Sequence, residues 1–331
     1  MKLLEVNNLS VSFNTMRGPL HAIDRISFGL EPGETLGIVG ESGCGKSITS
    51  LAIMGLLPPN ALLKAALMTF AGKELTTMPE SARRALRGCE IGMIFQDPMT
   101  SLNPCFTVGQ QITETLRVHE GGTKQWRKSK AIELLNRVGI PDAVHQLDSY
   151  PHQLSGGMCQ RIMIAIAISC KPKLLIADEP TTALDVTIQA QILDLLRDLR
   201  REEGMGLVLI THDIAVVAEM ADRIAVMYAG QIVESGPTRD VIMKPSHPYT
   251  EGLLKCLPAM HGPQEHKTKL PSIPGLVPDL VHRPPACQLN PRCPYRFERC
   301  TVDEPANEWL NGRFVKCHRP LNAAETAGAR T

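Results

Sequence analysis

A glycine-rich loop near the start of the chain constrains the fold more than any other feature of the sequence. Residues Gly40–Ser47 read Gly-Glu-Ser-Gly-Cys-Gly-Lys-Ser and fit the pattern G-x-x-x-x-G-K-[ST]. The apolar run Thr35–Val39 predicts a short strand before the loop, and Ser47–Leu57 has helical spacing after it. This order of strand, glycine loop and helix is typical of α/β domains.

The residue types in this loop favour binding of a nucleotide. Glycines let consecutive backbone N–H groups curl around phosphate oxygens, and the start of a helix adds free donors and a favourable dipole. Lys46 would place a cation at the outer phosphates, and Ser47 would offer its hydroxyl to Mg²⁺. A glycine turn that binds nothing explains the loop but not the Lys-Ser pair.

A second acidic motif lies downstream. The apolar run Leu174–Ala177 predicts a buried strand that ends in Asp178 and Glu179. Asp178 could lie near Mg²⁺, and Glu179 could orient or deprotonate an attacking water. Many strands end at charged turns, so the Asp-Glu pair alone is weak evidence for a catalytic site. The glycine loop earlier in the same domain strengthens that interpretation.

The wider pattern predicts an α/β fold with a mainly parallel sheet, because strand-like and helix-like runs alternate over residues 1 to about 235. Leu3–Phe13 alternates weakly and suggests an antiparallel side sheet, and Gln110–Val138 suggests an inserted helical subdomain. The further predicted elements are strands at Glu90–Phe95 and Leu207–Thr211 and an amphipathic helix at Thr187–Arg200.

Composition argues against nucleic acid as a partner, since the net charge is +1 and aromatic residues make up 4%. The longest apolar run near the middle, Ile162–Cys170, is far shorter than the roughly 20 residues of a spanning helix. The first residues also lack the apolar core of a signal peptide. We therefore expect a cytosolic chain that reaches a membrane only through partners.

Prolines become frequent after about residue 245, and this change suggests that the chain has three parts. We predict a nucleotide-binding domain over 1–245, with its helical subdomain at about 100–170, and a loop-rich extension over 246–321. Residues 322–331 are predicted to form a disordered end.

The segment Leu154–Met158 reads Leu-Ser-Gly-Gly-Met and resembles the signature sequence, normally LSGGQ, of ATP-binding-cassette (ABC) proteins. A serine at the start of a helix is also a good N-cap. The order of four other positions extends the resemblance over roughly residues 1–240. These are an aromatic residue for adenine, a Q-loop glutamine, a D-loop aspartate and a switch histidine: Phe13, Gln96, Asp185 and His212.

Resemblance to the ABC family implies roles for these residues. Catalysis is expected from Glu179, His212, Gln96 and Lys46, and Mg²⁺ binding from Ser47, Gln96 and Asp178. ATP binding is expected from Phe13, Gly40, Ser42, Gly43, Cys44, Gly45, Lys46, Ser47, Gln96 and Asp178. ATP held by a second cassette is expected to contact Ser155, Gly156, Gly157 and Asp185.

Further segments are similar to the oligopeptide and dipeptide importer branch of the family. They are Phe95–Pro104, His247–Thr250, Ile273–Gly275 and Asn290–Pro294. The resemblance implies an ATPase on the cytoplasmic face of the plasma (inner) membrane that powers peptide import. Its implied partners are a second cassette, by resemblance a paralogue, two permease subunits and, indirectly, a substrate-binding protein. A peptide-like or metal-chelate cargo stays open, as does an ABC ATPase outside transport.

Four cysteines cluster in the tail, at Cys287, Cys293, Cys300 and Cys317. In a cytosolic chain such clustering favours a metal centre over disulfides, and four thiolates suit zinc or an iron–sulfur cluster. Resemblance to the peptide-importer ATPases implies a [4Fe–4S] cluster, whose expected role is to order the tail. Four free thiols in a loose tail are the alternative.

Overall fold

The computed structural model describes residues 1–182, 184–256, 273–284, 286–310 and 312–322. Contacts divide the chain into two interleaved units, each considered by itself. The first unit contains Met1–Leu4, Leu30–Glu34 and Phe70–Ile210, and the second contains the rest. The boundaries predicted near residues 245 and 321 stay predictions, and residues 323–331 of the expected disordered end lie outside the described residues.

Parallel strands form the centre of the first unit. Strand β8 (Leu174–Asp178) lies between β7 (Ile91–Ile94) and β9 (Gly206–Thr211) and is parallel to both. The residues of these strands are nearly all apolar and buried, as expected for a parallel sheet covered on both faces. The three strands predicted for this part of the chain are confirmed, with ends that differ by at most one residue.

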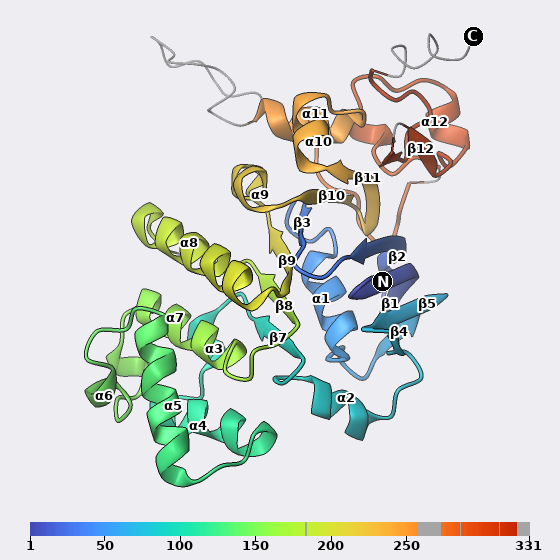
Figure 1. Cartoon of the computed structure of the whole chain (residues 1–331). Coiled ribbons are helices and arrows are strands. Elements are labelled where there is room, and N and C mark those ends of the chain that lie inside the picture. Colours follow the sequence, from blue (N-terminus) through green and yellow to red (C-terminus); the bar gives the residue numbers. More distant parts are fainter. Residues whose placement is uncertain (183, 257–272, 285, 311, 323–331) are drawn as a thin grey trace, which may run out of the picture. The chain divides into compact units, whose positions relative to one another are not determined.

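Helices α4 (Val108–His119), α5 (Lys124–Arg137) and α7 (Gly156–Ala167) pack side by side in this unit (Figure 1). The first of them starts at a capping box between Thr107 and Gln110. The predicted helical segment Gln110–Val138 therefore consists of two helices. The remaining elements of the unit are β6 (Lys73–Glu74), α2 (Glu80–Leu86), α3 (Pro98–Ser101), α6 (Ala143–Gln146), the short 3-10 helix η1 (Pro151–Gln153) and α8 (Val186–Glu203).

The second unit contains the predicted antiparallel side sheet. Strand β1 (Leu4–Thr15) lies between β2 (Gly18–Leu30) and β5 (Leu67–Phe70), and it also pairs antiparallel with β4 (Ala61–Lys64). Every second residue at the start of β1 is buried, which accounts for the alternation seen in the sequence.

A mixed sheet forms the other part of the second unit. Strand β3 (Thr35–Val39) is parallel to β10 (Arg223–Tyr228), and β10 is antiparallel to β11 (Gln231–Pro237). Helix α9 (Ile214–Met220) packs against β3. Helix α1 (Lys46–Met54) is shorter than the predicted Ser47–Leu57, because Gly55 ends it in the left-handed conformation at φ 66°.

The predicted loop-rich extension contains several short helices and strands among its described residues. A hairpin of β12 (Glu308–Leu310) and β13 (Arg313–Val315) adds to the mixed sheet through β11. Gly312 adopts φ 76°, the left-handed conformation that glycine favours in the turns of such hairpins. The other elements here are α10 (Thr238–Met243), α11 (Pro248–Lys255), the short 3-10 helix η3 (Asn290–Arg292) and α12 (Arg299–Val302).

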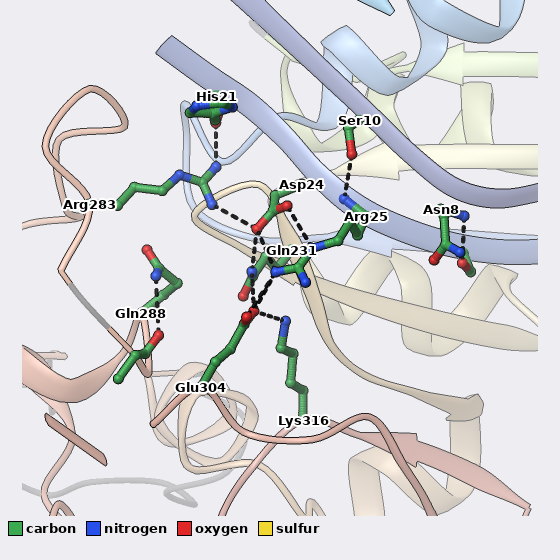
Figure 2. Close-up of polar contacts among 12 residues, drawn as sticks. Asn8, Ser10, His21, Asp24, Arg25, Gln231, Arg283, Gln288, Glu304 and Lys316 are labelled. Atoms are coloured by element: carbon green, nitrogen blue, oxygen red, sulfur yellow. Dashed lines mark hydrogen bonds and ion pairs between the residues drawn. The ribbon is translucent and has the colours of Figure 1, made fainter. Parts of the chain in front are cut away.

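A charged network ties the C-terminal region to the side sheet within the second unit (Figure 2). The Arg25 Nη2 atom donates to both oxygens of Glu304 at 2.8 Å, and Lys316 Nζ donates to the same carboxylate at 2.6 Å. The Gln231 Nε2 group donates to Asp24 at 2.6 Å and to Glu304 at 3.1 Å, and it thereby joins Asp24 to this network. Burial alone would raise the pKa of Glu304, but the bonds from Arg25 and Lys316 outweigh it and lower that pKa.

No helix among the described residues is both long and apolar enough to cross a bilayer.

Candidate functional site

The glycine loop lies between β3 and α1, as the sequence predicts. Two of its glycines are required by close approaches of the backbone. A Cβ atom on Gly40 would lie 2.1 Å from the Met227 carbonyl oxygen, and one on Gly45 would lie 2.6 Å from that of Ala22. Gly45 also has φ 105° and forms the N-cap of α1 without any side chain of its own. The loop therefore leads directly into the first turn of α1, and the backbone N–H groups at the start of a helix favour the binding of an anion.

Lys46 points back along the loop. Its Nζ atom donates to the carbonyl oxygens of Gly40 at 2.8 Å and Glu41 at 3.1 Å, and the residue is 5% exposed. The loop also packs the Cys44 thiol inside, and burial raises the pKa of that thiol. The ammonium group is thus held at the loop and has neighbouring donors in the backbone N–H groups.

The two acids lie at the end of β8 in the first unit. Asp178 is 4% exposed, and Glu179 follows it with φ 48°, a left-handed conformation that costs energy in a non-glycine residue. Glu179 Oε2 accepts hydrogen bonds from Gln96 Nε2 at 3.0 Å and from Thr182 Oγ1 at 2.9 Å. The structure therefore brings together two predicted catalytic residues and adds Thr182, which the sequence analysis missed.

The Leu-Ser-Gly-Gly-Met segment begins α7. Ser155 is the N-cap, and its Oγ atom accepts from the backbone N–H of Met158 at 3.3 Å. Ser155 and Gly156 are exposed, whereas a Cβ on Gly157 would lie 3.1 Å from Ile188. The expected capping role of the serine is confirmed, and its hydroxyl stays at the surface.

The other predicted residues divide between the units. Asp185 caps α8 in the first unit by accepting from the N–H of Ile188 at 2.9 Å. His212 is exposed after β9, and Phe13 is half-buried on β1 opposite Ala61, both in the second unit with the glycine loop. The first unit holds Gln96, the two acids and the Ser155 segment.

The four clustered cysteines line one small pocket in the second unit, together with His247 and His318. Burial raises the pKa of the Cys287 and Cys293 thiols, and it raises that of Cys317 to about 11. As a donor set the four thiols suit a metal centre. In the part of the chain that the structure describes, however, no group of three or more His, Cys, Asp or Glu side chains is gathered so as to hold a metal ion.

Comparison with known proteins identifies the family. The family model described as ABC transporter matches residues 23–182, and the one described as Oligopeptide/dipeptide transporter, C-terminal region, matches residues 233–300. The chain is 57% identical over 325 residues to the Dipeptide transport ATP-binding protein DppD of Escherichia coli (strain K12), with 98% of each chain covered. This chain belongs to the ABC transporter family of ATPases. Its DppD relative in Haemophilus influenzae (strain ATCC 51907 / DSM 11121 / KW20 / Rd) is also 57% identical, over 97% of each chain.

Solved structures confirm the predicted ABC fold class. The ATP-binding cassette MJ0796, in a dimeric post-hydrolysis state bound to ADP and Pi, superposes with a TM-score of 0.65 and 26% identity. The alignment covers 71% of this ABC ATPase and 99% of that chain. The resemblance drawn from the signature segment and the ordered motifs is therefore confirmed at the level of family and fold.

One part of the site is absent from the sequence-based description. Glu41, inside the glycine loop, is bonded to Tyr249 and Arg292 of the C-terminal region. Sequence patterns miss these contacts because the partners lie 208 and 251 positions further along the chain. Tyr249 and Arg292 lie in two segments that resemble peptide importers, His247–Thr250 and Asn290–Pro294. That resemblance is the one feature of the sequence that singles these two residues out.

Proposed function

We propose that this ABC ATPase powers the import of dipeptides or oligopeptides. The observation that carries the proposal is the 57% identity along nearly the whole chain to a dipeptide transport ATP-binding protein, together with the matching C-terminal region. The C-terminal match matters most for the cargo, because the nucleotide-binding part alone is shared by transporters of many solutes.

In the proposed reaction water attacks the γ-phosphorus of ATP, and the bond between that phosphorus and the ADP oxygen breaks. Glu179 accepts a proton from the water, and its hydrogen bonds from Gln96 and Thr182 support an oriented carboxylate. Lys46 and the loop N–H groups stabilise the charge on the phosphate oxygens, and His212 holds the γ-phosphate and the water. ADP and phosphate then leave.

Ser47, Gln96 and Asp178 are the proposed holders of Mg²⁺, since hydroxyl, amide and carboxylate oxygens are the donors that this ion prefers. When bound, Mg²⁺ neutralises part of the phosphate charge. Asp178 ends a buried strand next to Glu179, which supports a fixed position for its carboxylate.

A second cassette is proposed to complete each site. Ser155, Gly156, Gly157 and Asp185 would contact the triphosphate bound by the partner, as the start of a helix favours an anion. The exposure of Ser155 and Gly156 supports this assignment, because a group that reaches another subunit must be at the surface. The solved cassette MJ0796 is likewise dimeric.

The remaining proposed partners are two membrane permease subunits and, through them, a substrate-binding protein. The proposed second cassette is a paralogue of this chain, and the proposed location is the cytoplasmic face of the inner membrane. No nucleic acid takes part in this scheme.

Uptake of labelled dipeptide tests the cargo. Cells that lack their own dipeptide-import ATPase, and carry this chain with its permeases and binding protein, are expected to regain uptake at least tenfold above background. A Glu179→Gln chain should not restore it, and uptake of the free amino acid should stay unchanged in all strains. Restored transport of a different solute, without dipeptide uptake, would refute the cargo but keep the ATPase role.

The four tail cysteines are proposed to hold a [4Fe–4S] cluster that orders the C-terminal region, with zinc as the alternative metal. Cys287, Cys293, Cys300 and Cys317 line one pocket. Burial raises the thiol pKa of three of them, Cys287, Cys293 and Cys317, so metal binding there would have to displace protons. The cluster is assigned no part in ATP hydrolysis.

Anaerobic purification tests the cluster. The protein is expected to be brown, with about four irons and matching acid-labile sulfide per chain, and Cys300→Ser should lose the colour. Cys105→Ser, which changes an exposed cysteine of the first unit, should keep it. Stoichiometric zinc without iron would show that the metal assignment is wrong.

A further inference from the structure

Glu41 places a negative charge in the loop that is expected to receive the negatively charged phosphates. Its carboxylate is paired with Arg292 through two parallel hydrogen bonds, from Nη1 to Oε2 at 2.7 Å and from Nη2 to Oε1 at 2.9 Å. Such a two-point pair between a guanidinium and a carboxylate is strong and fixes both groups in direction. The carboxylate is therefore compensated and oriented by the C-terminal region.

Arg292 is itself held in place. Its side chain is 4% exposed, and its Nε atom donates to the carbonyl oxygen of Pro274 at 2.9 Å. The guanidinium lies 5.7 Å from the centre of the Tyr228 ring. These contacts fix the arginine, so the Glu41 carboxylate has a compensating positive charge at a constant position.

Tyr249 holds the same residue through its backbone. The Glu41 N–H donates to the Tyr249 hydroxyl at 2.9 Å, and Tyr249 is 1% exposed with its ring 4.6 Å from that of Tyr228. The carbonyl oxygen of Glu41 accepts from Lys46 Nζ and from the Cys44 N–H, at 3.1 and 3.3 Å. The backbone N–H and carbonyl of Glu41 are thus both held, which sets the shape of the loop, whereas the carboxylate is held separately by Arg292.

We propose that Arg292 and Tyr249 are positioning residues for the phosphate-binding loop, so that the C-terminal region sets the affinity of this chain for ATP. Arg292 acts by cancelling the charge of Glu41, and Tyr249 acts by fixing the backbone at the start of the loop. Neither residue is assigned a contact with ATP. The proposal rests on the role of the loop in ATP binding, which wild-type protein tests separately.

The position of Arg292 also joins the loop to the cysteine pocket. Arg292 directly precedes Cys293, and the side chains of Cys287 and Cys293 pack against the buried cluster that contains Tyr228, Tyr249 and Leu289. Disorder of the cysteine segment would therefore release the same arginine that restrains Glu41. This places the loop under the influence of a region far from it in the sequence.

Calorimetry of Mg-ATP binding to the purified full-length chain tests the proposal. The decisive result is whether the Kd rises or falls in each variant. Arg292→Gln is expected to raise the Kd about tenfold, because the Glu41 charge is left beside the phosphates. Glu41→Gln should leave the Kd unchanged or lower it, and the double variant should return to within about threefold of wild type. Tyr249→Phe, which keeps the ring and removes the hydroxyl, should raise the Kd about fivefold.

A merely structural ion pair gives a different pattern. Glu41→Gln would then weaken binding as much as Arg292→Gln, and the double variant would show no recovery; that result overturns the proposal. Urea unfolding of each variant separates affinity from stability, and the double variant and Tyr249→Phe carry the test if Arg292→Gln does not fold. Arg299→Gln, which breaks an exposed pair with Asp303, is the matched control and should bind like wild type. Loss of ATP binding by wild type would instead refute the role of the loop itself.

Discussion

Steady-state ATP hydrolysis is expected to fall by about 10²- to 10⁴-fold when Glu179 is replaced by glutamine, while ATP binding is kept. The amide cannot accept the proton of the attacking water, but it is nearly the same size as the carboxylate. Its oxygen can still accept from Gln96 or Thr182, so the local structure is expected to survive. Phosphate release by the assembled transporter and Kd for Mg-ATP of the purified chain are the two measurements.

Glu203→Gln is the matched control for that experiment. Glu203 is an acid of the same unit that is ion-paired with Arg137 at 2.7 Å, at the end of α8. Its side chain is partly buried, but it is not one of the residues proposed to act on ATP, so its replacement should leave turnover within about twofold of wild type once any loss of stability is measured separately. A Glu179→Gln transporter that kept more than half of the wild-type turnover would show that another group accepts the proton.

Affinity for ATP is expected to fall by roughly 100-fold when Lys46 is replaced by alanine. Hydrogen bonds from a charged group contribute about 1.5–3 kcal/mol each, and two such bonds to phosphate would give about 3 kcal/mol or more. In the structure the Lys46 ammonium donates to the Gly40 and Glu41 carbonyl oxygens. Any of these bonds that is replaced by a bond to phosphate reduces the net gain in binding energy. The measurement is the Kd for Mg-ATP.

Lys64→Ala separates a local effect from a change in net charge. Lys64 is an exposed lysine on β4 of the same unit, and its removal should leave the Kd within about twofold of wild type. Equal losses for both variants would indicate that overall charge, and not the position of Lys46, governs binding.

Local patterns predict the elements that hold the proposed site residues. The strands before the glycine loop and before Asp178 are buried and nearly all apolar, so their hydrophobic runs were visible without any knowledge of the fold. The N-cap role of Ser155 followed from a rule that involves residues within one helical turn. The family resemblance then predicts the fold to which these elements belong, and the comparisons confirm that fold.

The missed features depend on contacts between distant segments. Thr182 has no distinguishing pattern of its own, and its role appears once Glu179 is placed beside it. Glu41 occupies a variable position of the G-x-x-x-x-G-K-[ST] pattern, so its two-point pair with Arg292 could not be read from the loop. Apolar spacing up to Leu57 predicts a helix longer than α1, which ends at Met54 because Gly55 adopts the left-handed conformation.

The parallel pairing of β3 with β10 has a consequence for how the protein is made. Thr35, which begins β3, bonds to Asp222, a residue 187 positions later. At roughly 5–20 residues per second, on the order of ten seconds pass on the ribosome before the partner strand of β3 exists. During that interval the apolar strand β3 is without its neighbour in the nascent chain. Newly synthesised protein is therefore expected to expose an unpaired apolar strand, which favours aggregation, until translation has passed β10.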